Sequence, residues 1–492
     1  MKSISVVKNV LHHVAAIPFV KRIRNPKRYQ TVSFFLDYLE KNGCNVHLND
    51  KGFRNRNKII VELCTCDSAY QSNYFPKNNA CLVSTKQTAI DAIQKGAIIL
   101  ITNINYDEFP CIITDNTLEV FAKMGRYYRD LHKELNVVAV SGSIGKTTIK
   151  NMIGEVYKTM FRTTYNKANA NTRMSVGYAV QYIPKDAQKM IQEIHEGNPN
   201  ETKYISEMLR PDLFVLTPID KSHFQRFGSE EKIIEEICSI TEHMPKDGRV
   251  IVNIDEFNRF DLLNGKKAVT ISEDNHNADY YLKNVCTTEK GLSFCIVSKE
   301  TGGIYNVVLD NIYAPHNAIC SLYAFAAGIC EGISPQKIIH GLSCYKTEGV
   351  RQNVKRTEDN VVVYADCFNA VGRSMKSAIE GADLIPVTGK RIAVLGDIKE
   401  GGEISSEMHC EVIQTVCNSK FDYLITLGEE METASKNVNE IDRLYVKNCQ
   451  SLEEVTSTLK KLLQSGDLVL FKASHSMELE KCINELWPSV FE

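Results

Sequence analysis

Residues 136–148 read NVVAVSGSIGKTT, and this stretch decides the fold. Residues 136–141 form a short apolar run, which is typical of a strand buried on both faces. Residues 142–145 form a turn rich in glycine and serine, and residues 147–160 have the apolar spacing of a helix. A glycine-rich turn between a buried strand and a helix directs backbone N–H groups and the positive end of the helix dipole at one point. The stretch therefore predicts a phosphate-binding loop.

The residue types in this loop indicate a nucleoside triphosphate with magnesium. We expect Lys146 to reach the β- and γ-phosphates and the Thr147 hydroxyl to bind Mg²⁺. The usual spacing places a glycine at position 140, which is Val140 here, so the loop has the shorter form G-x-x-G-K-T-T. A glycine turn with an incidental lysine is the alternative interpretation. The loop residues predicted to bind ATP are Gly142, Ser143, Ile144, Gly145, Lys146, Thr147 and Thr148.

Strands alternate with helices on both sides of the loop, and this alternation predicts an α/β fold with parallel sheets. The strands expected around the loop are residues 58–64, 97–102, 213–219 and 248–254. Helices are expected over 87–96 and 317–332, and a β-rich insertion over 267–310. The part before the loop is a small α/β unit, and the part around it is a parallel-sheet unit of the P-loop ATPase kind.

A third run of strands and helices begins after residue 347 and has the pattern of a Rossmann-like domain. Its expected strands are residues 361–366, 391–396, 423–428, 443–447 and 467–472. We therefore predict three domains: a small α/β N-terminal domain (1–134), a central ATP-binding domain (135–346) and a C-terminal Rossmann-like domain (347–492).

The composition is that of a globular protein. The chain has 492 residues, of which 43% are hydrophobic and 24% are charged, and its mean hydropathy is −0.22. No apolar run reaches the roughly 18–20 residues that cross a bilayer, which argues against an integral membrane protein. The 16 cysteines are scattered without zinc spacing. We therefore expect reduced core cysteines and a cytoplasmic protein.

The N-terminal part is basic, with twelve Lys and Arg against three Asp and Glu in the first 60 residues. Residues 5–20 have helical apolar spacing up to Pro18. We favour a helix packed on the N-terminal domain, and contact with an anionic membrane surface is the alternative. A solvated surface explains the charge as well as a phosphorylated ligand does. No nucleic-acid partner is expected.

Seven segments resemble, in the right order, motifs of the Mur ligase family of ATP-dependent amide-bond-forming enzymes of cell-wall synthesis. The segments are residues 142–148, 169–172 followed by Gly177, 223–231, 316–328, 366–375, 394–402 and 471–480. The resemblance extends from residue 135 to about residue 490. Within the family it is greatest to the UDP-N-acetylmuramoyl-tripeptide–D-alanyl-D-alanine ligase (MurF) type.

The resemblance implies an activity. In such a ligase ATP converts a carboxylate into an acyl phosphate, which an amine then attacks. The implied cofactors are ATP and Mg²⁺, and the implied partners are a small-molecule carboxylate, UDP-linked in the family, and an amine or dipeptide. The expected reaction joins D-Ala-D-Ala or a similar amine to a UDP-muramyl peptide, with residues 1–134 as an atypical substrate-binding domain.

The resemblance also implies roles for individual residues. Lys146, Glu193 and His223 are the implied catalytic residues. Thr147, Glu193 and His223 are the implied metal ligands, and a hard carboxylate such as Glu193 suits Mg²⁺. Glu196 is a competing carboxylate nearby. The other residues implied to bind ATP are His316, Asn317, Arg351, Asp366 and Asn369. Lys472 also ends an expected strand, and a surface lysine is a sufficient interpretation of it.

Several positions depart from the family. The family lysine that is carbamylated to become an anionic magnesium ligand falls at Ile237, and Glu235 or Glu236 could supply the missing charge. Cys320 replaces an asparagine near the adenine, and Phe368 replaces a tyrosine. The N-terminal domain lacks the usual UDP-sugar stretch. Two alternatives follow: a related ligase with a non-peptidoglycan acid and amine, and an ATP-binding pseudo-ligase that acts as a scaffold.

Overall fold

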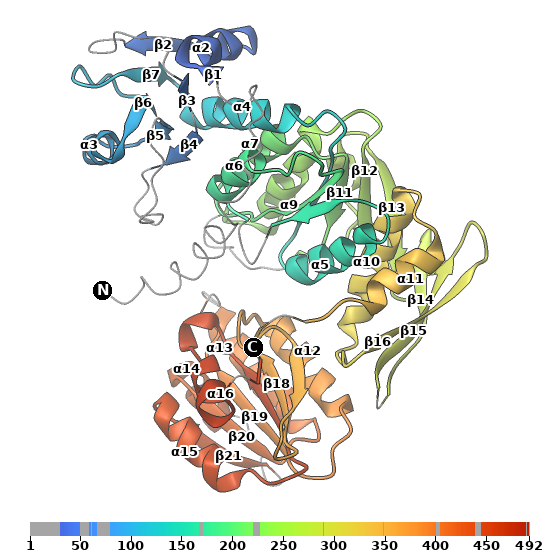
Figure 1. Cartoon of the computed structure of the whole chain (residues 1–492). Coiled ribbons are helices and arrows are strands. Elements are labelled where there is room, and N and C mark those ends of the chain that lie inside the picture. Colours follow the sequence, from blue (N-terminus) through green and yellow to red (C-terminus); the bar gives the residue numbers. More distant parts are fainter. Residues whose placement is uncertain are drawn as a thin grey trace.

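The computed structural model describes residues 30–49, 59–60, 62–65, 79–166, 171–219, 227–288, 290–347, 349–399, 404–437, 444–488 and 490–491. In this part the chain forms three α/β units that follow one another along the sequence, each with its own main sheet (Figure 1). The predicted fold class is confirmed. The helix expected over 5–20 lies outside the described residues. No helix in the described ranges is long and apolar enough to cross a membrane.

The N-terminal unit is built on a five-stranded sheet with the order β2-β7-β6-β5-β4. Its strands are β2 (Val46–Asn49), β4 (Glu62–Thr65), β5 (Asn79–Leu82), β6 (Ala97–Thr102) and β7 (Cys111–Thr114), and only the β2–β7 ladder is antiparallel. A separate antiparallel pair joins β1 (Gln30–Thr31) to β3 (Ile59–Ile60). Its helices are α2 (Val32–Lys41), α3 (Lys86–Lys95) and α4 (Thr117–Asp130). Helix α3 is followed by Gly96, where the sequence predicts its end, and this glycine has the left-handed backbone conformation that commonly terminates helices.

The central unit is built on a nine-stranded sheet with the order β16-β15-β14-β13-β12-β11-β8-β10-β9. Strand β8 (Asn136–Ser141) is the apolar run before the loop, and it lies between the parallel strands β10 (Lys189–Glu193) and β11 (Leu213–Leu216). Strands β9 (Thr163–Tyr165) and β12 (Arg249–Asn253) continue the sheet on either side. Because later strands lie on both sides of β8, its carboxyl end is a switch point, where sheets of this kind bind ligands.

The region 267–310 is rich in strands, as expected, and its four strands extend the central sheet. Strands β13 (Lys267–Ser272) and β14 (Tyr280–Thr288) join in parallel, and β15 (Gly291–Ser298) and β16 (Ile304–Asp310) follow antiparallel. The helices of this unit are α5 (Lys146–Lys158), α6 (Arg173–Gln181), α7 (Glu201–Leu209), α9 (Glu230–Cys238), α10 (His316–Cys330) and α11 (Pro335–Ser343). Helix α10 is apolar around most of its surface, which suits its burial against the sheet, α5 and α11.

The C-terminal unit is built on a six-stranded sheet with the order β17-β18-β22-β19-β20-β21, parallel except for β17 at its edge. Its strands are β17 (Asn353–Arg356), β18 (Val362–Asp366), β19 (Arg391–Gly396), β20 (Tyr423–Leu427), β21 (Tyr445–Cys449) and β22 (Leu468–Lys472). Its helices are α12 (Gly372–Leu384), α13 (Ser405–Cys417), α14 (Glu429–Asn437), α15 (Leu452–Leu462) and α16 (Glu480–Leu486). The five strands expected in this region are all present.

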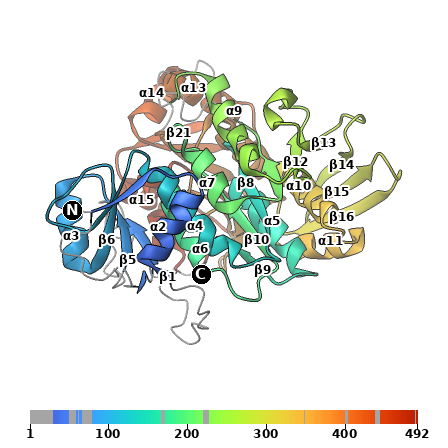
Figure 2. The same ribbon diagram turned by 90° about the horizontal axis from the view of Figure 1, so that it is seen from above.

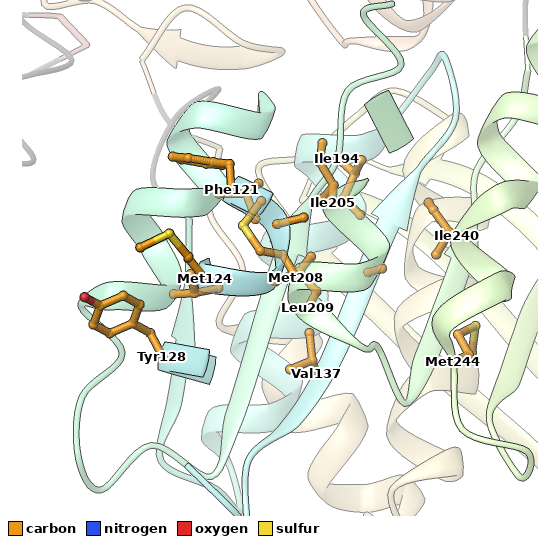
Figure 3. Close-up of a cluster of buried hydrophobic side chains, with 14 of the residues drawn as sticks. Phe121, Met124, Tyr128, Val137, Ile194, Ile205, Met208, Leu209, Ile240 and Met244 are labelled. Atoms are coloured by element: carbon orange, nitrogen blue, oxygen red, sulfur yellow. The ribbon is translucent and has the colours of Figure 1, made fainter. Parts of the chain in front are cut away.

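Helix α4 fixes the N-terminal unit to the central unit. Figure 2 shows α4 beside α6 and α7 of the central unit, and these helices are in contact. Phe121, Met124 and Tyr128 of α4 are buried in one apolar cluster with Met208 and Leu209 of α7 (Figure 3). The two units therefore share a hydrophobic core, although their sheets are separate.

We expect Met208→Ala to lower the free energy of unfolding by about 2–5 kcal/mol, because it removes a fully buried side chain from this shared core. Urea unfolding followed by circular dichroism measures the change. Met160→Ala is the matched control, since Met160 is 50% exposed and its loss should change stability by no more than about 0.5 kcal/mol. Equal stability of the two variants would contradict a shared core at α4.

Candidate active site

The phosphate-binding loop connects the carboxyl end of β8 to α5 and needs glycine at two positions. Gly142 has a φ of +137°, and a Cβ there would overlap the hydroxyl and carbonyl oxygens of Thr217. Gly145 has a φ of +79° and is the N-cap of α5. A side chain would strain the backbone at both positions. The loop therefore lies closely against β11 and opens at the start of α5.

The loop residues use their backbone N–H groups in two ways. The N–H groups of Ser143 and Ile144 donate to the carbonyl oxygen of Pro218, at 2.9 and 3.1 Å. The first N–H groups of α5 lack partners inside the helix and coincide with the positive end of its dipole. An anion at this point would therefore be bound mainly by the first turn of the helix, which comprises Gly145, Lys146, Thr147 and Thr148.

Lys146 contacts a buried carboxylate beside the loop. Its Nζ atom lies 3.3 Å from Oε2 of Glu196, and it also donates to the carbonyl oxygen of Gly142. Glu196 is fully buried, whereas Lys146 is 12% exposed. The ammonium group is therefore held at the mouth of the loop by fixed partners. Glu196 therefore pairs with Lys146. The next residue in the loop, Thr147, contacts the carboxylate of Glu193 instead.

Thr147 and Glu193, two of the three predicted metal ligands, are in direct contact. Glu193 ends β10 next to Val140 of β8, and its side chain is 3% exposed. Its Oε2 atom accepts a hydrogen bond from Thr147 Oγ1 at 2.8 Å, and its Oε1 atom accepts one from Asn171 Nδ2 at 2.8 Å. Asn171 was not among the predicted site residues, although it lies in the segment 169–172 that resembles the family. The third predicted ligand, His223, lies outside the described residues.

These residues fit a magnesium ion that is bound together with a nucleotide. The Thr147 hydroxyl and the Glu193 carboxylate are the hard oxygen donors that Mg²⁺ prefers, and they lie beside an anion site. Within the described ranges, no group of three or more His, Cys, Asp and Glu could hold a metal ion. Phosphate oxygens and water would have to complete the coordination, which is usual for magnesium.

The start of α10 approaches the loop from another direction. Cys320 Sγ lies 3.7 Å from the position that a Cβ on Gly145 would take, and His316 and Asn317 lie one helical turn earlier. Asn317 Oδ1 and His316 Nε2 are buried and have no hydrogen-bond partner among the described residues. Desolvation lowers the pKa of His316, so its ring is neutral at pH 7. Unsatisfied polar atoms at this place fit the polar edges of a nucleotide.

Arg351 of the C-terminal unit reaches the loop. Its Nη1 atom donates to Thr147 Oγ1 at 2.8 Å. The guanidinium group lies over the ring of Phe368, with Cζ 3.3 Å from the ring centroid. The phenyl ring that replaces the family's tyrosine therefore supports this arginine without a hydroxyl. The structure thus brings Arg351 to Thr147, as its predicted role in binding ATP requires.

Asp366 and Asn369 bind Lys472, and the described contacts include none between them and the loop. Asp366 and Lys472 are direct partners at the ends of β18 and β22, and Lys472 Nζ lies 2.9 Å from Asp366 Oδ2. Lys472 also donates to the backbone carbonyl of Asn369. Its side chain is 1% exposed, so the interpretation of Lys472 as a surface lysine is wrong. The neighbouring strand, which is distant in sequence, supplies the carboxylate that allows its burial.

The positions around Ile237 have structural roles. Ile237 is fully buried in the apolar core of the central unit. The Glu236 carboxylate accepts hydrogen bonds from the backbone N–H groups of Asn200, at 2.7 Å, and Thr202, at 2.8 Å. Glu236 therefore caps the start of α7 and is not available as the replacement metal ligand considered above. Glu235 is exposed on the same helix.

Comparisons with known proteins match both the sequence and the fold. Residues 140–328 match the Mur ligase middle domain, and residues 350–475 match the Mur ligase, glutamate ligase domain. The chain is 30% identical over 378 residues to the UDP-N-acetylmuramoyl-tripeptide–D-alanyl-D-alanine ligase of Bacillus subtilis, covering 76% of this chain and 80% of that protein.

Two solved structures have a similar fold. MurF from Acinetobacter baumannii superposes with a TM-score of 0.78 and 20% identity, over 93% of this chain and 98% of that chain. MurF from Thermotoga maritima in complex with ADP superposes with a TM-score of 0.70 and 20% identity, over 86% of this chain and 96% of that chain. A match over 93% has to include most of the N-terminal unit, which therefore shares the fold despite its different motifs. By sequence and by fold, the chain belongs to the Mur ligase family.

Proposed function

We propose that the protein is an ATP-dependent carboxylate–amine ligase that joins D-alanyl-D-alanine, or a similar amine, to a UDP-muramyl peptide in peptidoglycan synthesis. The main support for this proposal is the position of the Thr147 hydroxyl and the residues that it contacts. Its hydroxyl meets a buried carboxylate from β10 and an arginine from the C-terminal unit, beside a phosphate-binding loop. The substrate pair is proposed from the name of the Bacillus subtilis relative.

The chain's own residues suit formation of an acyl phosphate from ATP and a carboxylate. Lys146, Arg351 and the first turn of α5 place positive charge where phosphate oxygens would lie, which offsets the repulsion between two anions. Thr147 and Glu193 would hold Mg²⁺, which supplies Lewis-acid stabilisation of the phosphate charge. We propose His223 as a further residue of this site. Contact between the C-terminal unit and the loop excludes water that would hydrolyse the acyl phosphate.

The proposed domain boundaries remain 1–134, 135–346 and 347–492. They are supported by the sheets, because the loop-bearing strand begins at Asn136 and β17 begins at Asn353. Helix α4 belongs to the first domain by sequence but packs on the second. We place the enzyme in the cytoplasm, where ATP and reduced cysteines are found. The basic N-terminal segment is not assigned a membrane role.

Phosphate release by the purified protein tests the function. The assay contains Mg-ATP with UDP-muramyl tripeptide and D-Ala-D-Ala, and parallel assays replace the acid or the amine with pools of other carboxylates and dipeptides. We expect release only when both substrates are present. Turnover only with another pool would show that the protein is a ligase with a different acid and amine. Nucleotide binding without turnover in any pool would favour the scaffold alternative.

We expect Glu193→Gln to raise the Mg²⁺ concentration for half-maximal phosphate release by at least about tenfold, because it removes the charge of a metal ligand while keeping its shape. A magnesium titration at saturating ATP measures the change. Glu155→Gln is the control, since Glu155 forms a surface ion pair with Lys158 on α5. An unchanged magnesium requirement in Glu193→Gln would remove this residue from the metal site.

Activity should not depend on dissolved CO₂. A lysine carbamate forms reversibly from an amine and CO₂, and Ile237 has no amine. We therefore expect enzyme in degassed buffer to turn over at the same rate with and without added bicarbonate. Activation by bicarbonate would show that another lysine is carbamylated, and the alignment at position 237 would be wrong.

A further inference from the structure

A buried lysine lies directly behind the metal-binding pair. Lys150 is one helical turn after Lys146 on α5, and its side chain is 1% exposed. Its Nζ atom donates to the backbone carbonyl of Asn166 at 2.8 Å and lies 3.7 Å from Oε2 of Glu193. Burial of an ammonium group is costly unless an anion is close, and Glu193 is such an anion. The proposed mechanism assigns Lys150 no role.

Asn166 joins the lysine and the carboxylate into one buried unit. Its side-chain carbonyl accepts a hydrogen bond from the backbone N–H of Glu193 at 2.9 Å, while its backbone carbonyl accepts the bond from Lys150. Asn166 follows β9 and is itself buried. Two other segments, helix α5 and the residue after β9, therefore fix the end of β10. They hold the Glu193 carboxylate against the Thr147 hydroxyl.

The charges at this point have an opposite effect on a metal ion. Glu193 and Lys150 sum to zero, so a divalent cation bound to Glu193 would lie close to a fixed ammonium group. Repulsion between the ammonium group and the metal ion weakens metal binding. This repulsion is large because a buried site has a low dielectric constant. Removing the lysine charge would also leave the metal-free carboxylate without this counter-ion, which destabilises the metal-free state more than the metal-bound state. Both effects predict that removal of the Lys150 charge strengthens metal binding.

We propose that Lys150 is the standing counter-ion of the metal site: it replaces the divalent cation at Glu193 in the metal-free enzyme and keeps the bound cation exchangeable. This inference rests on the proposed function, since it needs a metal–nucleotide site at Thr147 and Glu193. Lys150 is a positioning residue in this scheme. It does not touch the substrate, and it acts through the carboxylate.

Binding of Mn²⁺ with ADP to the full-length protein at pH 8.5 tests the proposal, measured by titration calorimetry and by the electron paramagnetic resonance of free Mn²⁺. Lys150→Gln keeps a donor for the Asn166 carbonyl but removes the charge. We expect it to bind Mn²⁺ at least about tenfold more tightly than wild type. We also expect a lower melting temperature without ligand and a larger rise on adding Mn²⁺ and ADP than in wild type. Lys150→Arg keeps the charge and should bind Mn²⁺ as wild type does.

Lys189→Met is the matched control. Lys189 is a buried lysine at the other end of β10, where it pairs with Glu331. Its loss should lower stability and leave Mn²⁺ affinity unchanged. Unchanged or weaker Mn²⁺ binding by Lys150→Gln would overturn the inference. If that variant folds only with ligand, the rate at which it releases Mn²⁺ on dilution is measured instead. Release slower than from wild type would support the inference, and release as fast or faster would overturn it. Absence of Mn²⁺ and ADP binding to the wild type would instead overturn the proposed function.

Discussion

Lys146→Ala should lower amine-dependent phosphate release by about a thousandfold. The ammonium group lies at the start of α5, where the phosphates would bind, and loss of one such preorganised donor costs roughly 10²–10³ in rate. Phosphate release at saturating Mg-ATP measures the loss. Lys158→Ala is the control, because Lys158 lies on the same helix in a surface ion pair and should not change the rate. A Lys146→Ala variant within about twofold of the wild-type rate would contradict the loop assignment.

A loss of folding could imitate this result, since Lys146 pairs with the fully buried Glu196. Breaking a buried ion pair by removing one partner costs about 3–5 kcal/mol. We therefore expect the melting temperature of Lys146→Ala to fall. The double variant Lys146→Ala with Glu196→Gln should regain stability but stay inactive. Recovery of both stability and turnover in the double variant would mean that Lys146 serves only to balance Glu196.

Lys472→Met should destabilise the C-terminal unit by about 3–5 kcal/mol. It leaves the carboxylate of Asp366 in a buried position without its ammonium partner, which lies 2.9 Å away in the intact protein. The single tryptophan of the chain, Trp487, is partly buried and packs against the core of the same unit, so its fluorescence during urea unfolding follows this unit. Adding Asp366→Asn to Lys472→Met should restore part of the loss.

The control for this prediction is an exposed ion pair of the same unit. Lys436 pairs with Glu432 on α14 and is 63% exposed, so Lys436→Met should change the free energy of unfolding by no more than about 1 kcal/mol. An equal effect of Lys472→Met and Lys436→Met would show that the Asp366 pair does not stabilise the unit. The family resemblance implies that Asp366 binds ATP, so turnover should also fall in Lys472→Met.

Elements with a strong local pattern were predictable from the sequence. The apolar runs 97–102, 136–141 and 391–396 form strands with these bounds, because an apolar run bounded by polar or glycine residues has few other ways to be buried. Strand β10 was missed, since KMIQE contains three polar residues in five. It lies between β8 and the edge strand β9, where Lys189 and Glu193 find partners from other segments.

The sequence by itself determined the α/β class, the phosphate-binding loop and the resemblance to the family, because these depend on local apolar patterns and on residue types at close spacing. The tertiary structure decided what each charged residue does. Glu236 caps a helix, Lys472 is buried against Asp366, and Lys150 lies behind Glu193. A buried charge needs a partner, and here each partner comes from a distant segment that only the packing of strands and helices brings near.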